Sequence, residues 1–139
     1  MAEILNEINR KVRILLIEDS ESVQVGYRRA LEDIASLFPA TNLIDARREL
    51  EGAVAAKKRG LPGFDFVVVD ACIPVTSGEE VIDTPNTTSL VTEFRSKLGT
   101  VPFIAASSEP TFNDQLVAAG CGYISNKNDL RAVIVRLVA

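Results

Sequence analysis

Carboxylates follow two apolar runs in this 139-residue sequence. The run Val12–Ile17 is followed by the acid pair Glu18-Asp19, and the run Phe66–Val69 is followed by Asp70. Short, β-branched runs of this kind are typical of buried strands in a parallel sheet, and open α/β folds place ligands at the carboxyl edge of such a sheet. We therefore expect the three carboxylates to share one acidic pocket.

Three converging carboxylates need a positive charge between them. Each close pair repels by ~4 kcal/mol at about 4 Å, for an effective dielectric constant of about 20. A hard divalent cation such as Mg²⁺ fits best, because it takes oxygen ligands from one or two carboxylates, keeps several waters and coordinates a substrate phosphate. An aspartate beside such a metal can attack phosphorus and form an acyl phosphate. The pocket is therefore suited to phosphoryl transfer onto an aspartate.

Two further strand ends carry groups that bind phosphoryl oxygens. Ser107-Ser108 follow the apolar run 103–106, and Lys127 follows the run 123–126. A hydroxyl offers a hydrogen bond, and an ammonium offers a point charge. Each residue alone is a common loop residue. The ordered set of an acid pair, Asp-x-x-Ile-Pro-x-x-x-Gly, a hydroxyl and a lysine is one that chance rarely assembles in a chain of this length.

Composition limits the class of protein. Hydrophobic residues at 47% and charged residues at 24% are typical of one folded globular domain. A net charge of −4 argues against a nucleic-acid surface, and the absence of His excludes histidine catalysis and histidine metal ligation. Cys72 and Cys121 lie in core-like runs, as reduced thiols do. No apolar stretch is long enough to span a membrane and the start is not signal-like, so we expect a cytoplasmic protein without a membrane partner.

Short β-branched runs alternate with longer segments of helical period, which predicts repeated βαβ units and a parallel sheet. The expected strands are 13–17, 42–45, 64–69, 102–105 and 122–125. The expected helices are 22–37, 47–59, 90–98 and 111–119, and a last helix that follows the cap Asn128-Asp129 and ends at Val138. The basic run 57–59 is expected to cap the second helix, and a capping box at 111–114 is expected to open the fourth. The turn-rich segment 83–89 is expected to be an inserted loop beside the pocket, either serving the site or neutral.

From Arg13 to nearly its end, the chain resembles the receiver domain of bacterial two-component response regulators. The resemblance implies a doubly wound, flavodoxin-like α/β fold with a five-stranded parallel sheet of order 2-1-3-4-5 and helices on both faces. We expect an N-terminal extension at 1–11 and a single receiver domain at 12–139. No output domain follows Ala139, so a stand-alone receiver is expected, as a monomer or weak homodimer.

The same resemblance implies a role for each site residue. Asp70 would accept a phosphoryl group from a sensor histidine kinase, a phosphotransfer protein or a small phosphodonor, Asp19 would bind Mg²⁺ directly, Glu18 would act largely through metal-bound water, Cys72 would offer its backbone carbonyl, Ser107 would bond the phosphoryl group and Lys127 would pair with it. The signal would pass to a downstream protein through the face formed by the fourth helix, fifth strand and fifth helix. Such a chain is no enzyme beyond its own phosphorylation and slow dephosphorylation.

Two positions depart from the family pattern. Asn128 follows Lys127, where receivers commonly carry a proline after a cis peptide, so the loop is expected to be either trans and reshaped or strained. Ile124 stands at the aromatic switch position, with Tyr123 one residue off and on the other face. These departures leave open a receiver-like interaction module whose output is independent of phosphorylation. A phosphatase-type hydrolase is the remaining alternative, although Cys72 stands where such enzymes carry a second Asp.

Overall fold

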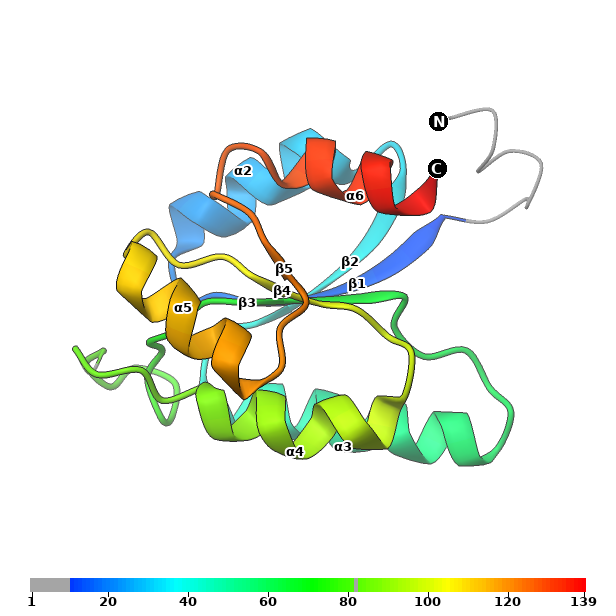
Figure 1. Cartoon of the computed structure of the whole chain (residues 1–139), viewed down its shortest axis with the longest axis horizontal. Helices are drawn as coiled ribbons and strands as arrows, with labels where there is room; N and C mark the ends of the chain where they lie inside the picture. Colours follow the sequence, from blue (N-terminus) through cyan, green and yellow to red (C-terminus); the bar gives the residue numbers. More distant parts are fainter. Residues whose placement is uncertain (1–10, 82) are drawn as a thin grey trace.

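A five-stranded parallel sheet with strand order β2-β1-β3-β4-β5 forms the centre of the computed structural model, which describes residues 11–81 and 83–139 (Figure 1). The strands are β1 (Val12–Ile17), β2 (Ala35–Ala40), β3 (Phe66–Val69), β4 (Phe103–Ala105) and β5 (Tyr123–Ile124). Strand β3 is apolar along its whole length and β1 is apolar except at Arg13, because both faces of these strands are covered. The α/β class and the strand order predicted from the sequence are confirmed.

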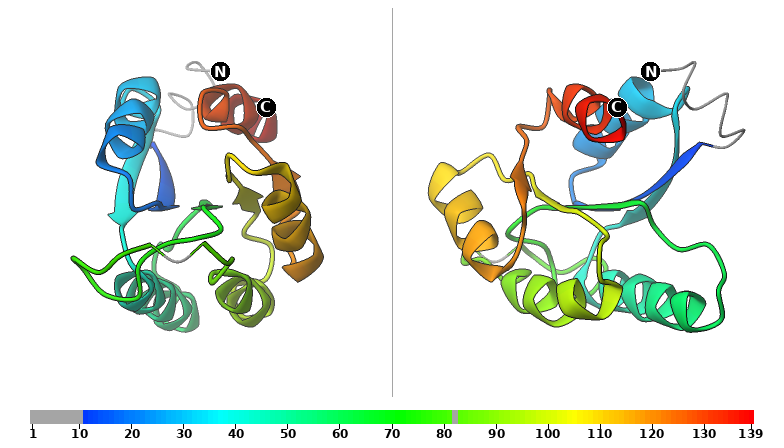
Figure 2. Two further views of the ribbon diagram at one scale, coloured as in Figure 1. Left: turned by 90° about the vertical axis from the view of Figure 1, so that its left-hand side faces the viewer. Right: turned by 45° about the vertical axis from the view of Figure 1, so that its right-hand side comes forward.

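Helices cover both faces of this sheet. They are α2 (Glu21–Leu31), α3 (Leu43–Lys58), α4 (Thr88–Leu98), α5 (Pro110–Ala119) and α6 (Leu130–Val138). Helices α2 and α6 lie on one face and α3, α4 and α5 on the other (Figures 1 and 2). Successive β1 residues therefore enter two cores, with Leu16 packing on the side of Tyr27 and Leu15 on the side of Leu50. In the part of the chain that the structure describes, no helix combines the length and apolar character needed to cross a membrane.

The second strand begins seven residues earlier than predicted, at Ala35–Ala40 instead of 42–45. The predicted helix 22–37 ends at Leu31, where a turn bonds the Ile34 N–H to the Leu31 carbonyl at 2.9 Å. Apolar residues continue at helical spacing beyond Leu31, but they belong to the following turn and to a strand at the sheet edge, not to the helix. An edge strand also tolerates Pro39, which has no N–H to donate. The segment 42–45 instead opens α3, with Asn42 as its N-cap.

Helices α4, α5 and α6 begin within two residues of their predicted starts, whereas α3 begins four residues earlier than predicted. The basic run does end α3, whose last turn carries Lys57 and Lys58. The predicted capping box at 111–114 is wrong, because α5 begins one residue earlier at Pro110 and its N-cap, Glu109, makes no side-chain cap bond. Described residues between Gly78 and Thr88 form no helix, in agreement with a loop inserted between β3 and α4.

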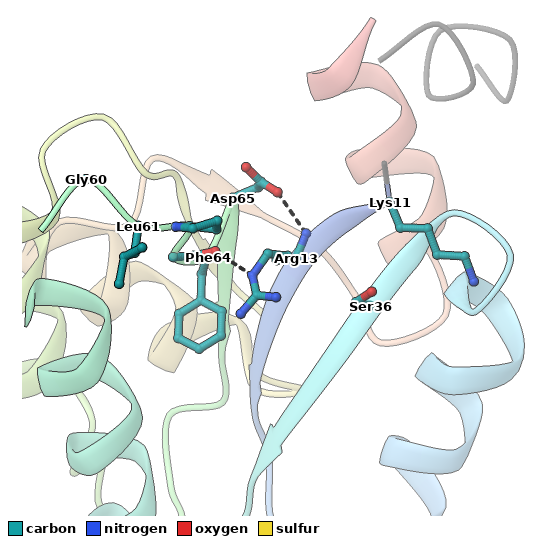
Figure 3. A pocket seen from close by; sticks show the side chains of 9 residues that line it. Lys11, Arg13, Ser36, Gly60, Leu61, Phe64 and Asp65 are labelled. Atoms are coloured by element: carbon teal, nitrogen blue, oxygen red, sulfur yellow. Dashed lines mark hydrogen bonds between the residues drawn. The ribbon is translucent and has the colours of Figure 1, made fainter. Parts of the chain in front are cut away.

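A cavity of about 600 Å³ lies at the amino edge of the sheet, where β1 begins (Figure 3). Arg13 Nε donates to the Gly63 carbonyl at 2.8 Å, and the Arg13 N–H donates to Asp65 Oδ2 at 2.8 Å (Figure 3). The guanidinium carbon also lies 4.6 Å from the centre of the Phe38 ring. These contacts fasten the start of β1 to the loop that enters β3, at the edge opposite to the acids.

Candidate functional site

The acids predicted from the strand ends do come together. Glu18 and Asp19 follow β1 and Asp70 follows β3, and one ligand oxygen from each residue lies within 4.8 Å of the other two. β1 and β3 are hydrogen-bonded neighbours in register, so their carboxyl ends coincide. Glu18 is only 2% exposed, while Asp19 and Asp70 are half-buried.

Lys127 reaches this cluster from the loop after β5. Its ammonium donates a hydrogen bond to Glu18 Oε1 and lies 3.4 Å from Asp70 Oδ2. Three ionised carboxylates and one ammonium leave a net charge of −2. A divalent cation would neutralise that remainder, as the sequence argument requires.

Burial and mutual repulsion set the protonation of the cluster. Burial raises the pKa of Glu18, the charge of Asp70 adds to this, and the hydrogen bond from Lys127 opposes both. Burial also raises the pKa of Asp19, helped by its neighbour Glu18. Burial alone would lower the pKa of Lys127, but the hydrogen bond with Glu18 and the charge of Asp70 outweigh it and raise that pKa. The lysine is therefore firmly cationic, while the acids gain from any added positive charge.

Ser107 follows β4 and faces the same space. Its Oγ accepts the Glu109 N–H at 3.1 Å, which leaves the hydroxyl hydrogen available to another acceptor. Together these residues line a cavity of about 300 Å³ at the carboxyl edge of the sheet. The lining residues are Glu18, Asp19, Ser20, Asp70, Cys72, Val81, Asp83, Ser107, Ser108, Glu109, Phe112 and Lys127. All six site residues named from the sequence are among them, and so are Asp83 of the inserted segment and Val81, which lies just before it.

Backbone contacts hold the two acidic strand ends in place. Gln24 of α2 donates to the Leu16 carbonyl at 3.0 Å and to the Glu18 carbonyl at 2.9 Å. Beyond β3, the buried Thr87 hydroxyl donates to the Asp70 carbonyl at 2.8 Å. Sequence reasoning missed both residues. A polar side chain near the start of a helix suggests a helix cap, and nothing in the sequence indicates that it bonds to the end of a strand instead.

Cys72 also lines the cavity. Among the described residues nothing donates a hydrogen bond to its backbone carbonyl, whereas the carbonyls of Asp70, Ala71 and Ile73 all accept one. Burial raises the pKa of the Cys72 thiol, and the Asp70 charge adds to this, so the side chain stays a neutral thiol. Carboxylate oxygens and a free carbonyl are the donors that a hard divalent metal takes, so these residues fit Mg²⁺.

The two departures from the receiver pattern have simple local structures. The peptide between Lys127 and Asn128 is trans, and the described chain contains no cis peptide. The Asn126 side chain shapes this loop instead, since its Oδ1 accepts the N–H groups of Asn128 and Asp129, both at 2.9 Å. Ile124 and Tyr123 are 49% and 40% exposed on the edge strand β5.

Several solved structures have a fold similar to that of this chain. No protein-family model and no curated protein matches the sequence. The chain is similar to the receiver domain of the histidine kinase CKI1 from Arabidopsis thaliana, with 20% identity, a TM-score of 0.68 and coverage of 95% of this chain and 93% of that one. It is also similar to the receiver domain of the sensor histidine kinase PA1611 from Pseudomonas aeruginosa, a structure with a magnesium ion in its active-site cleft, with 20% identity, a TM-score of 0.67 and coverage of 92% and 94%.

A third similar structure is a response regulator from Burkholderia pseudomallei with a phosphorylated aspartic acid and a calcium ion. It shares 19% identity with this chain at a TM-score of 0.64, and the match covers 93% of this chain and 67% of that one. The chain thus has the fold of response-regulator receiver domains.

Proposed function

We propose that this chain is a phosphorylation-dependent signalling switch. Asp70 accepts a phosphoryl group from a sensor histidine kinase, a phosphotransfer protein or a small phosphodonor, and Mg²⁺ assists. The observation that carries the proposal is the single cavity in which three carboxylates, a lysine and a serine hydroxyl meet at the carboxyl edge of the sheet. The magnesium and the phosphorylated aspartate of two similarly folded proteins support it.

Asp19, Asp70 and the Cys72 carbonyl would hold the metal, with Glu18 acting largely through metal-bound water. When bound, the ion supplies charge neutralisation and orients the donor phosphate. The Asp70 carboxylate attacks phosphorus, an Asp70 oxygen–phosphorus bond forms, and the bond from phosphorus to the donor's leaving group breaks. The leaving group departs with the electron pair of that bond, and Asp70 becomes an acyl phosphate.

Lys127 and Ser107 then bind the oxygens of the new phosphoryl group. The ammonium that contacts Glu18 and Asp70 before phosphorylation moves toward the phosphoryl oxygens. The Ser107 hydroxyl, whose hydrogen is available, donates to another phosphoryl oxygen. These two groups come from the ends of β4 and β5, so their movement reaches the face formed by α5, β5 and α6, where Val117, Tyr123 and Ile124 are exposed. A downstream protein would dock on this face in one state in preference to the other.

The proposal places the chain in the cytoplasm, as a monomer or weak homodimer without a nucleic-acid partner. Free Cys72 and Cys121 are typical of a reducing compartment. One observation favours the second candidate, an interaction module whose docking ignores phosphorylation. The exposed Ile124 has no aromatic ring to turn between the surface and the site.

Phosphorylation of Asp70 is tested by intact-protein mass spectrometry after incubation with acetyl phosphate and Mg²⁺. We expect a gain of about 80 Da, the mass of one added phosphoryl group. The gain should disappear in Asp70→Asn, which keeps the shape of the side chain but removes the nucleophilic carboxylate, and should persist in Asp83→Asn, the matched change on the inserted segment of the same cavity. A gain that persists in Asp70→Asn, or no gain with any donor, would contradict the proposal.

A further inference from the structure

Two asparagine side chains each hold one residue of a site loop by both of its backbone groups. Asn86 Oδ1 accepts the Ile73 N–H at 3.1 Å, and Asn86 Nδ2 donates to the Ile73 carbonyl at 2.6 Å. Asn113 Oδ1 accepts the Ser107 N–H at 2.9 Å, and Asn113 Nδ2 donates to the Ser107 carbonyl at 2.9 Å. Asn86 lies in the same loop as Ile73, two residues before α4 begins, and Asn113 lies in the first turn of α5. We call each pair of bonds a clamp.

The Asn86 clamp fixes the direction of the Cys72 carbonyl. Cys72 C=O and Ile73 N–H belong to one planar trans peptide, in which the two groups point in opposite directions. Because the N–H points at Asn86, the carbonyl points away from it. The clamp and Thr87 also occupy the carbonyls of Asp70, Ala71 and Ile73. Among the carbonyls of residues 70–73, only that of Cys72 accepts no hydrogen bond from the described residues, and Cys72 lines the acidic cavity.

The Asn113 clamp acts on the hydroxyl residue in the same manner. The last hydrogen bond between the segments of β3 and β4 runs from the Ala106 N–H to the Val69 carbonyl at 2.9 Å. Asn113 holds the next residue, Ser107. Asn113 is only 7% exposed, so water competes little for these bonds. The Ser107 backbone is therefore fixed, and the Glu109 N–H donates a hydrogen bond to its Oγ at 3.1 Å. A hydroxyl fixed in this way needs little reordering when a phosphoryl oxygen arrives.

We propose that Asn86 and Asn113 are positioning residues with separate tasks: Asn86 directs the Cys72 carbonyl toward the metal, and Asn113 directs the Ser107 hydroxyl toward the phosphoryl group. The inference rests on the proposed function, since it assigns a purpose to groups around Asp70. Because each clamp touches only one loop, removing one should impair one ligand and spare the other.

The test compares Asn86→Ala and Asn113→Ala with Asn42→Ala. Asn42 is a matched control, because it is 2% exposed and also makes two side-chain hydrogen bonds, both to Asp45 at the start of α3. Calorimetry measures the affinity for Mg²⁺ alone and then for beryllofluoride, a phosphoryl mimic, at saturating Mg²⁺. Each variant is studied well below its own unfolding temperature.

We expect Asn86→Ala to weaken Mg²⁺ binding by about tenfold or more, as changes to residues that orient metal ligands do. Asn113→Ala should bind Mg²⁺ within about twofold of the wild type and beryllofluoride about tenfold more weakly. Asn42→Ala should lose stability and keep both affinities. Equal losses in Asn42→Ala, or unchanged Mg²⁺ affinity in Asn86→Ala, would overturn the inference.

Asn86→Asp covers the case in which Asn86→Ala does not fold. The aspartate keeps the acceptor for the Ile73 N–H, so the peptide stays oriented, while the donor to the Ile73 carbonyl is lost. We expect lower stability with Mg²⁺ affinity at least equal to that of the wild type. A fall in affinity that parallels the fall in stability would show a merely structural role. A wild-type protein that binds neither Mg²⁺ nor beryllofluoride would refute the proposed function itself, whereas wild-type binding with unaltered variants refutes only the positioning roles.

Discussion

Lys127 balances the charge of the acidic cluster. Its ammonium contacts both Glu18 and Asp70, and its side chain is 21% exposed, so water screens these contacts only in part. Raised pKa values of Glu18 and Lys127 show the two sides of this balance, because the buried acid resists ionisation and the lysine resists deprotonation. We expect a bound metal or a phosphoryl group on Asp70 to change which oxygen atoms the Lys127 ammonium contacts.

Lys127→Met should therefore destabilise the metal-free protein at neutral pH, by about 2–3 kcal/mol, because it leaves a buried carboxylate without its partner. Mg²⁺ should then raise the free energy of unfolding more in this variant than in the wild type, since the ion replaces the missing charge. Urea unfolding with and without Mg²⁺ measures both effects.

Lys97→Met serves as the control for this change. Lys97 contacts Glu93 at 3.1 Å on the surface, where its side chain is 50% exposed, and its loss should cost no more than about 0.5 kcal/mol. If Lys127→Met were as stable as the wild type in metal-free buffer, Lys127 would not be the group that neutralises the acids.

Sequence reasoning found the residues whose place in the site follows from a strand end. Asp70 directly follows β3, and Ser107 comes two residues after the end of β4. A parallel sheet brings such positions to one edge. Asn86, Thr87 and Asn113 could not be found in this way. Their partners lie 6 to 17 residues away along loops, and the path of a loop is not encoded in any periodicity.

At the scale of elements, α3 and α4 are joined by an ion-pair network on one face of the sheet. Arg47 of α3 donates to both carboxylate oxygens of Glu93, at 2.9 and 3.0 Å, and Lys97 donates to Glu93 from the next turn of α4. The hydrogen bond from Arg47, followed by that from Lys97, lowers the pKa of Glu93 to about 2. Since α4 follows the inserted segment, this network ties that segment's end to the rest of the fold.

The lowered pKa of Glu93 predicts a pH dependence. A carboxyl whose pKa is depressed by folding stabilises the protein above its unfolded value of 4.5, and this contribution disappears as the pH falls through about 2. The wild type should therefore be more stable than Glu93→Gln near neutral pH, and the two should converge toward pH 2. Urea unfolding across this range measures the difference, and a difference that does not change with pH would contradict the role given to the ion pairs.

The elements also show where sequence patterns stop being informative. Strands β1 and β3 are buried on both faces and could be predicted from composition alone. Strand β2 lies at the edge, is only partly buried and contains Pro39, so its residues carried no strand pattern and were divided between a helix and a loop. The predicted sheet order was not affected by this error, because it came from the resemblance to receiver domains and not from the boundaries of single strands.

At the scale of the whole molecule, the two edges of the sheet have different tasks. The amino edge is fastened by Arg13 to the loop before β3, while the carboxyl edge gathers segments after β1, β3, β4 and β5 around one cavity. A change at Asp70 therefore touches the ends of three other segments at once. This arrangement is what a switch requires, because one modification is sensed by several elements that lead to the surface.

A crystal structure with Mg²⁺ and beryllofluoride tests the central claim most directly. We expect beryllium bonded to an Asp70 oxygen and the metal bound by Asp19, Asp70 and the Cys72 carbonyl. The Ser107 hydroxyl and the Lys127 ammonium should both contact fluoride atoms, with the ammonium no longer on Glu18. A complex in which Asp70 carries no beryllofluoride at saturating concentrations, while Lys127 still contacts Glu18, would contradict the account.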